Sequence, residues 1–151
     1  MSHFHPDHIA NLQHIKWESL YQGKNTYKYT HIGEIVESDI NVDETDIKLR
    51  IFQMPSSHAK GSLALLVNNK YCLLGDALYP AHKGDKTVYN AGILKQQIDI
   101  LKKMAAPYVL LSHREPFVQK KQAVISWLEK IYAMREKNEP WILMTGQNVP
   151  N

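Results

Sequence analysis

The first eight residues of the chain constrain its fold more than any other stretch. Three histidines and one aspartate lie between positions 3 and 8, in the order His-x-His-x-Asp-His. Side chains of an extended segment alternate between two sides, so His3, His5 and Asp7 can point to the same side. His8 follows directly, where we expect the chain to turn into a helix. Four side chains of types that bind metal ions can therefore converge with almost no loop to close.

A histidine cluster of this kind could also occur without any metal. A purification tag would carry a homopolymeric histidine run, and this stretch is not one. An ordinary surface cluster could arise by chance, because the chain holds 8 histidines among its 151 residues. Partners farther along the chain favour a metal site over a tag remnant or a chance cluster.

Composition predicts one ordinary globular domain, residues 1–151. The hydrophobic content of 44% and the charged content of 22% are typical of such proteins. The net charge of +3 is too small to favour binding of nucleic acid or of a membrane surface. A single cysteine, Cys72, excludes an internal disulfide and fits a cytoplasmic location. We find no apolar run of about 18 residues and no secretory signal, so we expect no membrane span.

The spacing of apolar residues predicts a chain of mixed helices and strands. We expect a helix over 9–22, short strands within 27–42, a turn at 41–44 and a half-buried strand over 47–52. A loop over 54–58 leads to a hairpin of two well-buried strands, 62–67 and 70–74, which turns at Asn68-Asn69. A surface loop is expected over 81–87 and a short buried strand over 108–111. Helices are expected over 89–104 and 119–137, and the tail 138–151 is expected to be coil.

Three further polar residues each follow a predicted strand. His58 stands in Met-Pro-Ser-Ser-His-Ala-Lys-Gly-Ser, Asp76 in Leu-Gly-Asp-Ala-Leu, and His113 in Leu-Ser-His-Arg-Glu-Pro. Taken singly, a histidine after a strand is more often a surface residue than a ligand, and Gly-Asp is more often a turn. Their occurrence in this order after the N-terminal motif is what favours one shared site. The residue types alone predict a metal site with nitrogen and oxygen ligands.

From His3 to about Pro116, these motifs resemble those of the metallo-β-lactamase superfamily. The family pattern has His-x-His-x-Asp-His, then a histidine in Pro-Gly-His-Thr-x-Gly-Ser, a Gly-Asp, and a final Gly-His-x-x-Pro. The resemblance implies an α/β (α+β) fold, the four-layer αβ/βα sandwich of that family. The context of Gly61-Ser62 and of His113-x-Glu115-Pro116 is closest to the glyoxalase II-like members.

The resemblance also implies a ligand set for two metal ions. His3, His5 and His58 would hold one metal, Asp7, His8 and His113 would hold the second, and Asp76 would bridge them. Three further histidines match no motif position and are predicted to be non-ligands: His14, His31 and His82. His82 is a weak candidate for contact with the substrate, because it follows Asp76 in the loop expected near the site.

The ligand types fit a hydrolytic metal centre. Imidazole and carboxylate without thiolate suit zinc, and also iron or manganese. The resemblance implies two divalent ions that activate a shared water as hydroxide, with Asp76 between them and Asp7 orienting the hydroxide or protonating the leaving group. The expected substrate is a small molecule, a thioester, ester, lactone or phosphoester. The identity of the substrate would depend on residues 79–87 and on the C-terminal tail with Trp141, and the sequence of these segments does not indicate which substrate they bind.

The chain departs from the family pattern in two ways. Ile9-Ala10 replaces the common glycine after the first motif, and Ala59 replaces a threonine; neither is a ligand position. In the family about a third of the domain precedes the first motif, which here starts at residue 3. We therefore expect the chain to form the C-terminal two-thirds of the fold, and the explanation we favour is that it is a fragment or the product of a truncated gene model. The alternatives are a dimer mate or second chain that covers the open sheet edge, and a shortened protein that folds alone. The competing function is a catalytically impaired remnant, or a chain that binds a partner.

Overall fold

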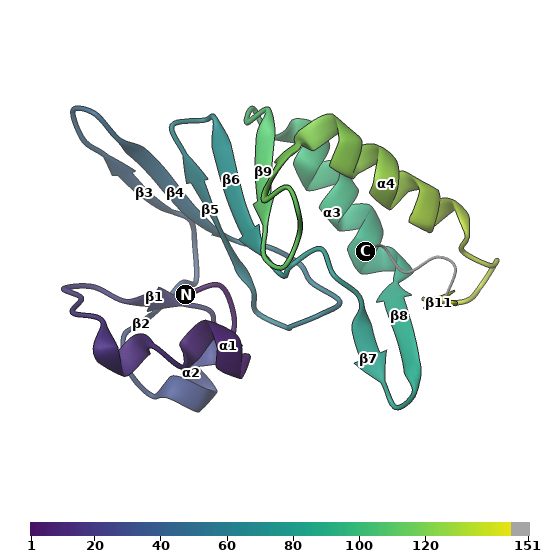
Figure 1. Ribbon diagram of the computed structural model, residues 1–151, viewed down its shortest axis with the longest axis horizontal. Coiled ribbons are helices and arrows are strands. Elements are labelled where there is room, and N and C mark those ends of the chain that lie inside the picture. Colours follow the sequence, from purple (N-terminus) through teal and green to yellow (C-terminus); the bar gives the residue numbers. More distant parts are fainter. Residues whose placement is uncertain (146–151) are drawn as a thin grey trace.

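A six-stranded sheet is the largest element of the computed structural model, which describes residues 1–145 (Figure 1). The strands lie in the order β10-β9-β6-β5-β4-β3. Their bounds are Ile40–Asp43 (β3), Lys48–Gln53 (β4), Leu63–Val67 (β5), Tyr71–Gly75 (β6), Tyr108–Leu111 (β9) and Val118–Lys120 (β10). All neighbouring pairs are antiparallel except β6 and β9, which run parallel.

Two helices cover one face of this sheet. Helix α3 spans Ala91–Lys103 and α4 spans Lys121–Ala133, and the two pack on each other. The Asn90 side chain caps α3 by accepting a hydrogen bond of 2.9 Å from the backbone N–H of Ile93. The core lies between the sheet and these helices, and its members include Leu66, Cys72, Leu74, Val109, Leu94, Leu101, Ile125 and Leu128.

The opposite face of the sheet carries a continuous aliphatic row. One residue of each strand takes part, and each pairs directly with the next across the sheet: Ile40, Ile51, Leu65, Leu73, Leu110 and Val118. Leu73 is 37% exposed and Val118 is 44% exposed. We call this row the aliphatic face. A hollow of about 410 Å³ lies against it, between the sheet and the N-terminal residues Ser2, Leu20 and Tyr21.

The β3–β4 hairpin carries charged residues on one face and apolar residues on the other. This hairpin projects away from α3 and α4 (Figure 1). On the helix side of the sheet it carries charged residues, with ion pairs between Arg50 and Asp39 (2.6 Å) and between Lys48 and Asp43 (3.1 Å). On the other side it carries Ile40 and Ile51, because successive side chains of a strand alternate. The face opposite the helices is therefore apolar even in this hairpin, where the helix side of the sheet is charged.

Smaller elements flank the large sheet. The N-terminal lobe consists of α1 (Pro6–Ile9), a 3₁₀ turn (Leu12–His14), the parallel strands β1 (Tyr21–Gln22) and β2 (Glu34–Ile35), and α2 (Lys24–Thr30). The third sheet has the order β11-β8-β7, with bounds Trp141–Met144, Lys86–Asn90 and Ala81–Lys83. No helix among residues 1–145 is long and apolar enough to cross a membrane.

The predicted helix over 9–22 is wrong. Within this stretch the chain forms the end of α1, the 3₁₀ turn and the short strand β1, and Ile15 and Trp17 remain 60% and 42% exposed. A helix of that length would need a buried apolar face, and these two side chains find none. Gly23 is the N-cap of α2, so residues 27–30 are helical and not strand.

Other boundaries also move. The turn expected at 41–44 lies three residues later, where the backbone N–H of Glu44 donates to the carbonyl of Ile47. The surface loop expected over 81–87 is the β7–β8 hairpin, which protrudes from the molecule (Figure 1). The tail is not all coil, because Trp141–Met144 pairs with β8 and buries Ile142 and Met144; residues 146–151 lie outside the described residues.

The predicted central elements are confirmed. The strand at 47–52, the hairpin that turns at Asn68-Asn69, the strand at 108–111 and both long helices are present, each within about two to four residues of its expected bounds. Asn68 and Asn69 have φ values of 50° and 51°, the left-handed values of a type I′ turn, and the backbone N–H of Lys70 donates to the carbonyl of Val67 at 2.9 Å. The expectation of two well-buried hairpin strands holds for the helix side only, since Leu73 is exposed. The chain is thus a mixed α and β structure.

Candidate metal centre

The parallel pair β6 and β9 brings two of the predicted ligands together. Asp76 follows β6 directly, and His113 comes two residues after β9. The carboxyl ends of parallel neighbours lie at the same sheet edge, so the two side chains emerge side by side. The backbone N–H of Ser112 donates to the carbonyl of Gly75 at 3.2 Å and holds the two strand ends together.

The N-terminal motif reaches this edge by pairing with β5. The backbone N–H of Leu63 donates to the carbonyl of Ser2 at 2.8 Å, which places His3 beside the end of β6. The expected alternation holds for His3 and His5 only. Helix α1 begins at Pro6, a residue suited to the first helical position, so Asp7 and His8 already belong to its first turn.

His58 comes from the loop between β4 and β5. The Ser56 hydroxyl accepts hydrogen bonds from the backbone N–H groups of His58 and Ala59, both at 3.1 Å, and so fixes the loop. His58 Nδ1 lies 3.2 Å from the carbonyl oxygen of Pro80. Because a carbonyl only accepts, Nδ1 carries the proton, and the lone pair of the ring is on Nε2.

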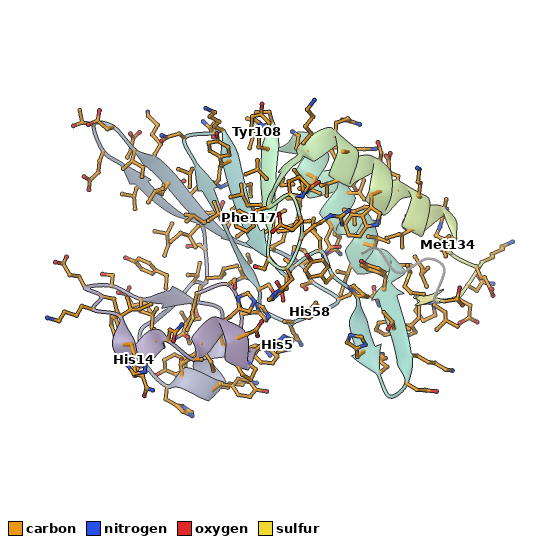
Figure 2. The ribbon with its side chains drawn as sticks, viewed as in Figure 1. His5, His14, His58, Tyr108, Phe117 and Met134 are labelled. Atoms are coloured by element: carbon orange, nitrogen blue, oxygen red, sulfur yellow. The ribbon has the colours of Figure 1, made fainter. Side chains whose placement is uncertain are left out.

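The seven predicted ligands form two groups that lie next to each other. One ligand atom of each of His3, His5 and His58 lies within 4.8 Å of the others, and the same holds for Asp7, His8, Asp76 and His113. Figure 2 shows His5 and His58 next to one another where the N-terminal lobe meets the rest of the molecule.

The Asp76 carboxylate lies between the two groups. Its Oδ2 atom is 3.4 Å from Nε2 of His8, 3.5 Å from Nε2 of His58, 3.7 Å from Nε2 of His113 and 3.9 Å from Nε2 of His3. Two ligand atoms of a tetrahedral zinc ion, each about 2.0–2.2 Å from it, lie about 3.3 Å apart. The separations around Asp76 are close to that value.

No known family model and no curated protein matches the chain. The geometry and chemistry of the centre's own residues therefore decide which ligands it can take.

Several polar atoms at the centre have no partner within the described protein. His8 Nε2, His58 Nε2 and Asp76 Oδ1 are buried and make no hydrogen bond. Buried polar atoms are nearly always paired, so three unpaired atoms at one point fit the binding of a cation. Three imidazoles around a carboxylate are also a donor set that zinc accepts. The residues present fit the metal ions that the sequence predicts.

The protonation states suit ligands. Burial, and after it the neighbouring His8 imidazole, lower the pKa of His3 to about 4. Burial likewise lowers the pKa of His58. Both rings are therefore neutral at physiological pH, and the neutral imidazole is the form that binds a metal.

Two residues that support the ligands carry no distinct sequence signal, since one is a serine next to a histidine and the other a lone tyrosine. The Ser2 hydroxyl lies 3.3 Å from Nδ1 of His3 and 3.1 Å from Nδ1 of His8, so it orients both rings. The Tyr79 hydroxyl donates to the carbonyl of Ser112, beside His113, and burial raises the pKa of this hydroxyl. The sequence indicates Tyr79 only as part of the specificity segment 79–87, and it does not indicate Ser2.

The remaining histidines lie outside both ligand groups. His14 lies at the outer side of the N-terminal lobe (Figure 2), and His31 is the exposed C-cap of α2. His82 is exposed on β7, and its Nδ1 is 3.3 Å from the Thr87 hydroxyl. Its role in substrate contact stays a prediction, and so do the roles of residues 79–87 and Trp141.

Proposed function

We propose that the chain is a metal-dependent hydrolase whose centre holds two divalent ions, zinc in the first place and iron or manganese as alternatives. The observation that carries this proposal is the position of Asp76 Oδ2, within 4 Å of an Nε2 atom from each of four histidines. His3, His5 and His58 would hold one ion, Asp7, His8 and His113 would hold the other, and Asp76 would bridge them. This arrangement supports the assignment to the metallo-β-lactamase superfamily, and we propose the family's four-layer αβ/βα sandwich on the resemblance of the motifs alone.

The chemistry divides between the ions and the protein. When bound, the ions would act as Lewis acids toward the substrate and lower the pKa of a water molecule to about 7. The protein supplies the geometry: Ser2 orients His3 and His8, and Pro80 fixes the tautomer of His58. Asp7 is the carboxylate best placed to move a proton, because its side chain is 52% exposed whereas that of Asp76 is 6% exposed.

The exposure of the ligands indicates how a substrate approaches. His3 is buried, with 1% of its side chain exposed, whereas His113 is 59% exposed. The centre is thus closed behind His3 and open beside Asp7 and His113. A small thioester, ester, lactone or phosphoester could reach it from that side with little rearrangement of the protein.

The Asp76→Asn variant tests the proposal with almost no change of shape. An amide cannot bridge two cations as a carboxylate does, so we expect loss of bound metal and of hydrolysis, measured with generic thioester, ester and phosphodiester substrates. The His14→Asn variant is the control, since His14 lies outside both groups. Unchanged metal content and turnover in Asp76→Asn would contradict the proposal.

The aliphatic face favours a second candidate function, association with a second copy of this chain. The row itself holds no charged residue, so two rows stacked on each other would bury no unpaired charge of their own. Sheet faces of this kind pack about 10 Å apart in sandwiches. Exposed apolar surface of this continuity is uncommon on a monomer. The mass of the chain in solution tests this candidate.

A further inference from the structure

Gln97 is a polar residue within the apolar side of α3. Its exposure is 0%, and its helix neighbours Leu94, Ile98 and Leu101 are core residues. A leucine or methionine would fill such a position without any polar group to satisfy. The amide therefore calls for a reason other than packing.

Both N–H groups of the Gln97 amide are used, each for a different loop. Nε2 donates to the carbonyl oxygen of Pro55 at 2.7 Å and to that of Ala77 at 2.6 Å. The Oε1 atom is buried and has no hydrogen-bond partner in the described protein. The reversed amide would place Oε1 against two carbonyl oxygens, so the orientation is fixed by the two loops.

These two loops carry ligands from opposite halves of the centre. Pro55 comes three residues before His58, and Ala77 follows Asp76 directly. His58 Nε2 and Asp76 Oδ2 lie 3.5 Å apart. One nitrogen atom that binds both loop backbones sets the distance between the loops, and through it the distance between these ligands.

We propose that Gln97 is a positioning residue that holds His58 and Asp76 at the separation a shared metal site requires. This inference rests on the proposed function. Gln97 donates its hydrogen bonds to backbone carbonyls and not to ligand side chains, so it acts through the backbone of both loops. Outer residues that orient ligands typically change metal affinity 10- to 100-fold when they are lost.

The test compares Gln97→Met with a matched control, Gln22→Met. Methionine keeps the length of glutamine and removes both donors. Gln22 is also 0% exposed, but its amide bonds Ile32 and Thr30, which carry no predicted ligand. Zinc affinity is measured by competition with a chromophoric chelator, and the absorption spectrum of the cobalt-loaded protein reports ligand geometry. In addition, hydrogen exchange of the backbone amides of His58 and Ala59 is measured in the presence of chelator.

We expect Gln97→Met to bind zinc about 10- to 100-fold more weakly than the unmodified chain, with a changed cobalt spectrum and faster exchange at His58 and Ala59. Gln22→Met should leave all three unchanged. Wild-type affinity, spectrum and exchange in Gln97→Met would overturn the proposal. Should Gln97→Met fail to fold, Gln97→Glu is measured instead; its buried carboxyl keeps one donor when protonated, and it should bind zinc more weakly than the unmodified chain.

The exchange measurement separates the two proposals. If the unmodified chain takes up no metal, the proposed function fails, and the positioning of the loops is judged by exchange alone. Faster exchange in Gln97→Met would then show that Gln97 joins the loops, and equal exchange would overturn that as well.

Discussion

Asp7 Oδ2 lies 3.0 Å from Nε2 of His113, although 106 positions separate the two residues in the chain. This contact joins the first ligand motif to the last. Both side chains are about half exposed, so the ion pair by itself would contribute little to stability. We therefore interpret the contact as one that positions two proposed metal ligands and not as one that stabilises the fold.

The His113→Ala variant should lose the more exposed of the two proposed metals. It removes one ligand of the group formed by Asp7, His8 and Asp76 and leaves the group of His3, His5 and His58 complete. We expect metal content to fall by about one ion per chain and turnover to fall at least about 100-fold. The His14→Ala variant, which removes an exposed histidine outside both groups, should change neither quantity.

Gly75→Ala should destabilise the protein through two separate effects. Gly75 has φ of +54°, and a Cβ there would lie 3.0 Å from Cβ and 3.1 Å from Oγ of Ser2. The control is Gly84→Ala, which has φ of +60° but nothing within 4 Å of the new Cβ.

We expect Gly84→Ala to lower the free energy of unfolding by about 1 kcal/mol, the cost of the left-handed backbone alone. Gly75→Ala should lower it by roughly 2–3 kcal/mol because Ser2 must also move. Urea unfolding in the presence of chelator measures both. Equal losses in the two variants would show that the contact with Ser2 carries no weight.

Cys72 should react with thiol reagents only when the protein unfolds. Burial raises the pKa of its thiol to about 12, so almost no thiolate exists at pH 8.

Burial raises the pKa of Tyr89 as well as that of Cys72, and this makes stability depend on pH. A raised folded-state pKa stabilises the protein below the unfolded pKa, and this contribution is lost as the pH rises toward the folded value. Stability should therefore fall above about pH 9; rapid labelling of Cys72 in the native protein at pH 8 would contradict its burial.

The Leu73→Lys variant tests self-association through the aliphatic face. We expect the unmodified chain to have twice the 17.4 kDa mass of one copy by light scattering, and Leu73→Lys to return it to one copy. Leu143→Lys changes another exposed leucine, which lies on β11 and is 48% exposed against 37% for Leu73, and should leave the mass at two copies. A mass of 17.4 kDa for the unmodified chain, or larger assemblies that Leu73→Lys leaves intact, would argue against pairing of two copies.

The sequence was a good guide wherever a pattern was both local and strong. The run Leu63–Val67 with the turn Asn68-Asn69 identified the central hairpin, and the spacing of Leu94, Ile98 and Leu101 identified α3. The order of the ligand motifs also identified seven candidate ligands, and the structure places the same seven residues in two adjoining groups.

Tertiary contacts decided the elements that the sequence did not predict. Strand β11 exists because the edge of β8 is free to pair with Trp141–Met144. The stretch 9–22 has a loose apolar spacing, but no surface receives Ile15 or Trp17. The supporting contacts of the centre, such as those made to the carbonyls of Pro55 and Pro80, involve backbone atoms that every residue has, so no sequence pattern identifies them.

Metal content per chain tests the central claim most directly. The protein is purified without chelator, and zinc, iron and manganese are measured by elemental analysis beside the Asp76→Asn variant. We predict about two metal ions per unmodified chain and well below one in the variant. A content near zero in the unmodified chain, with no uptake on addition of zinc, would contradict a dinuclear centre.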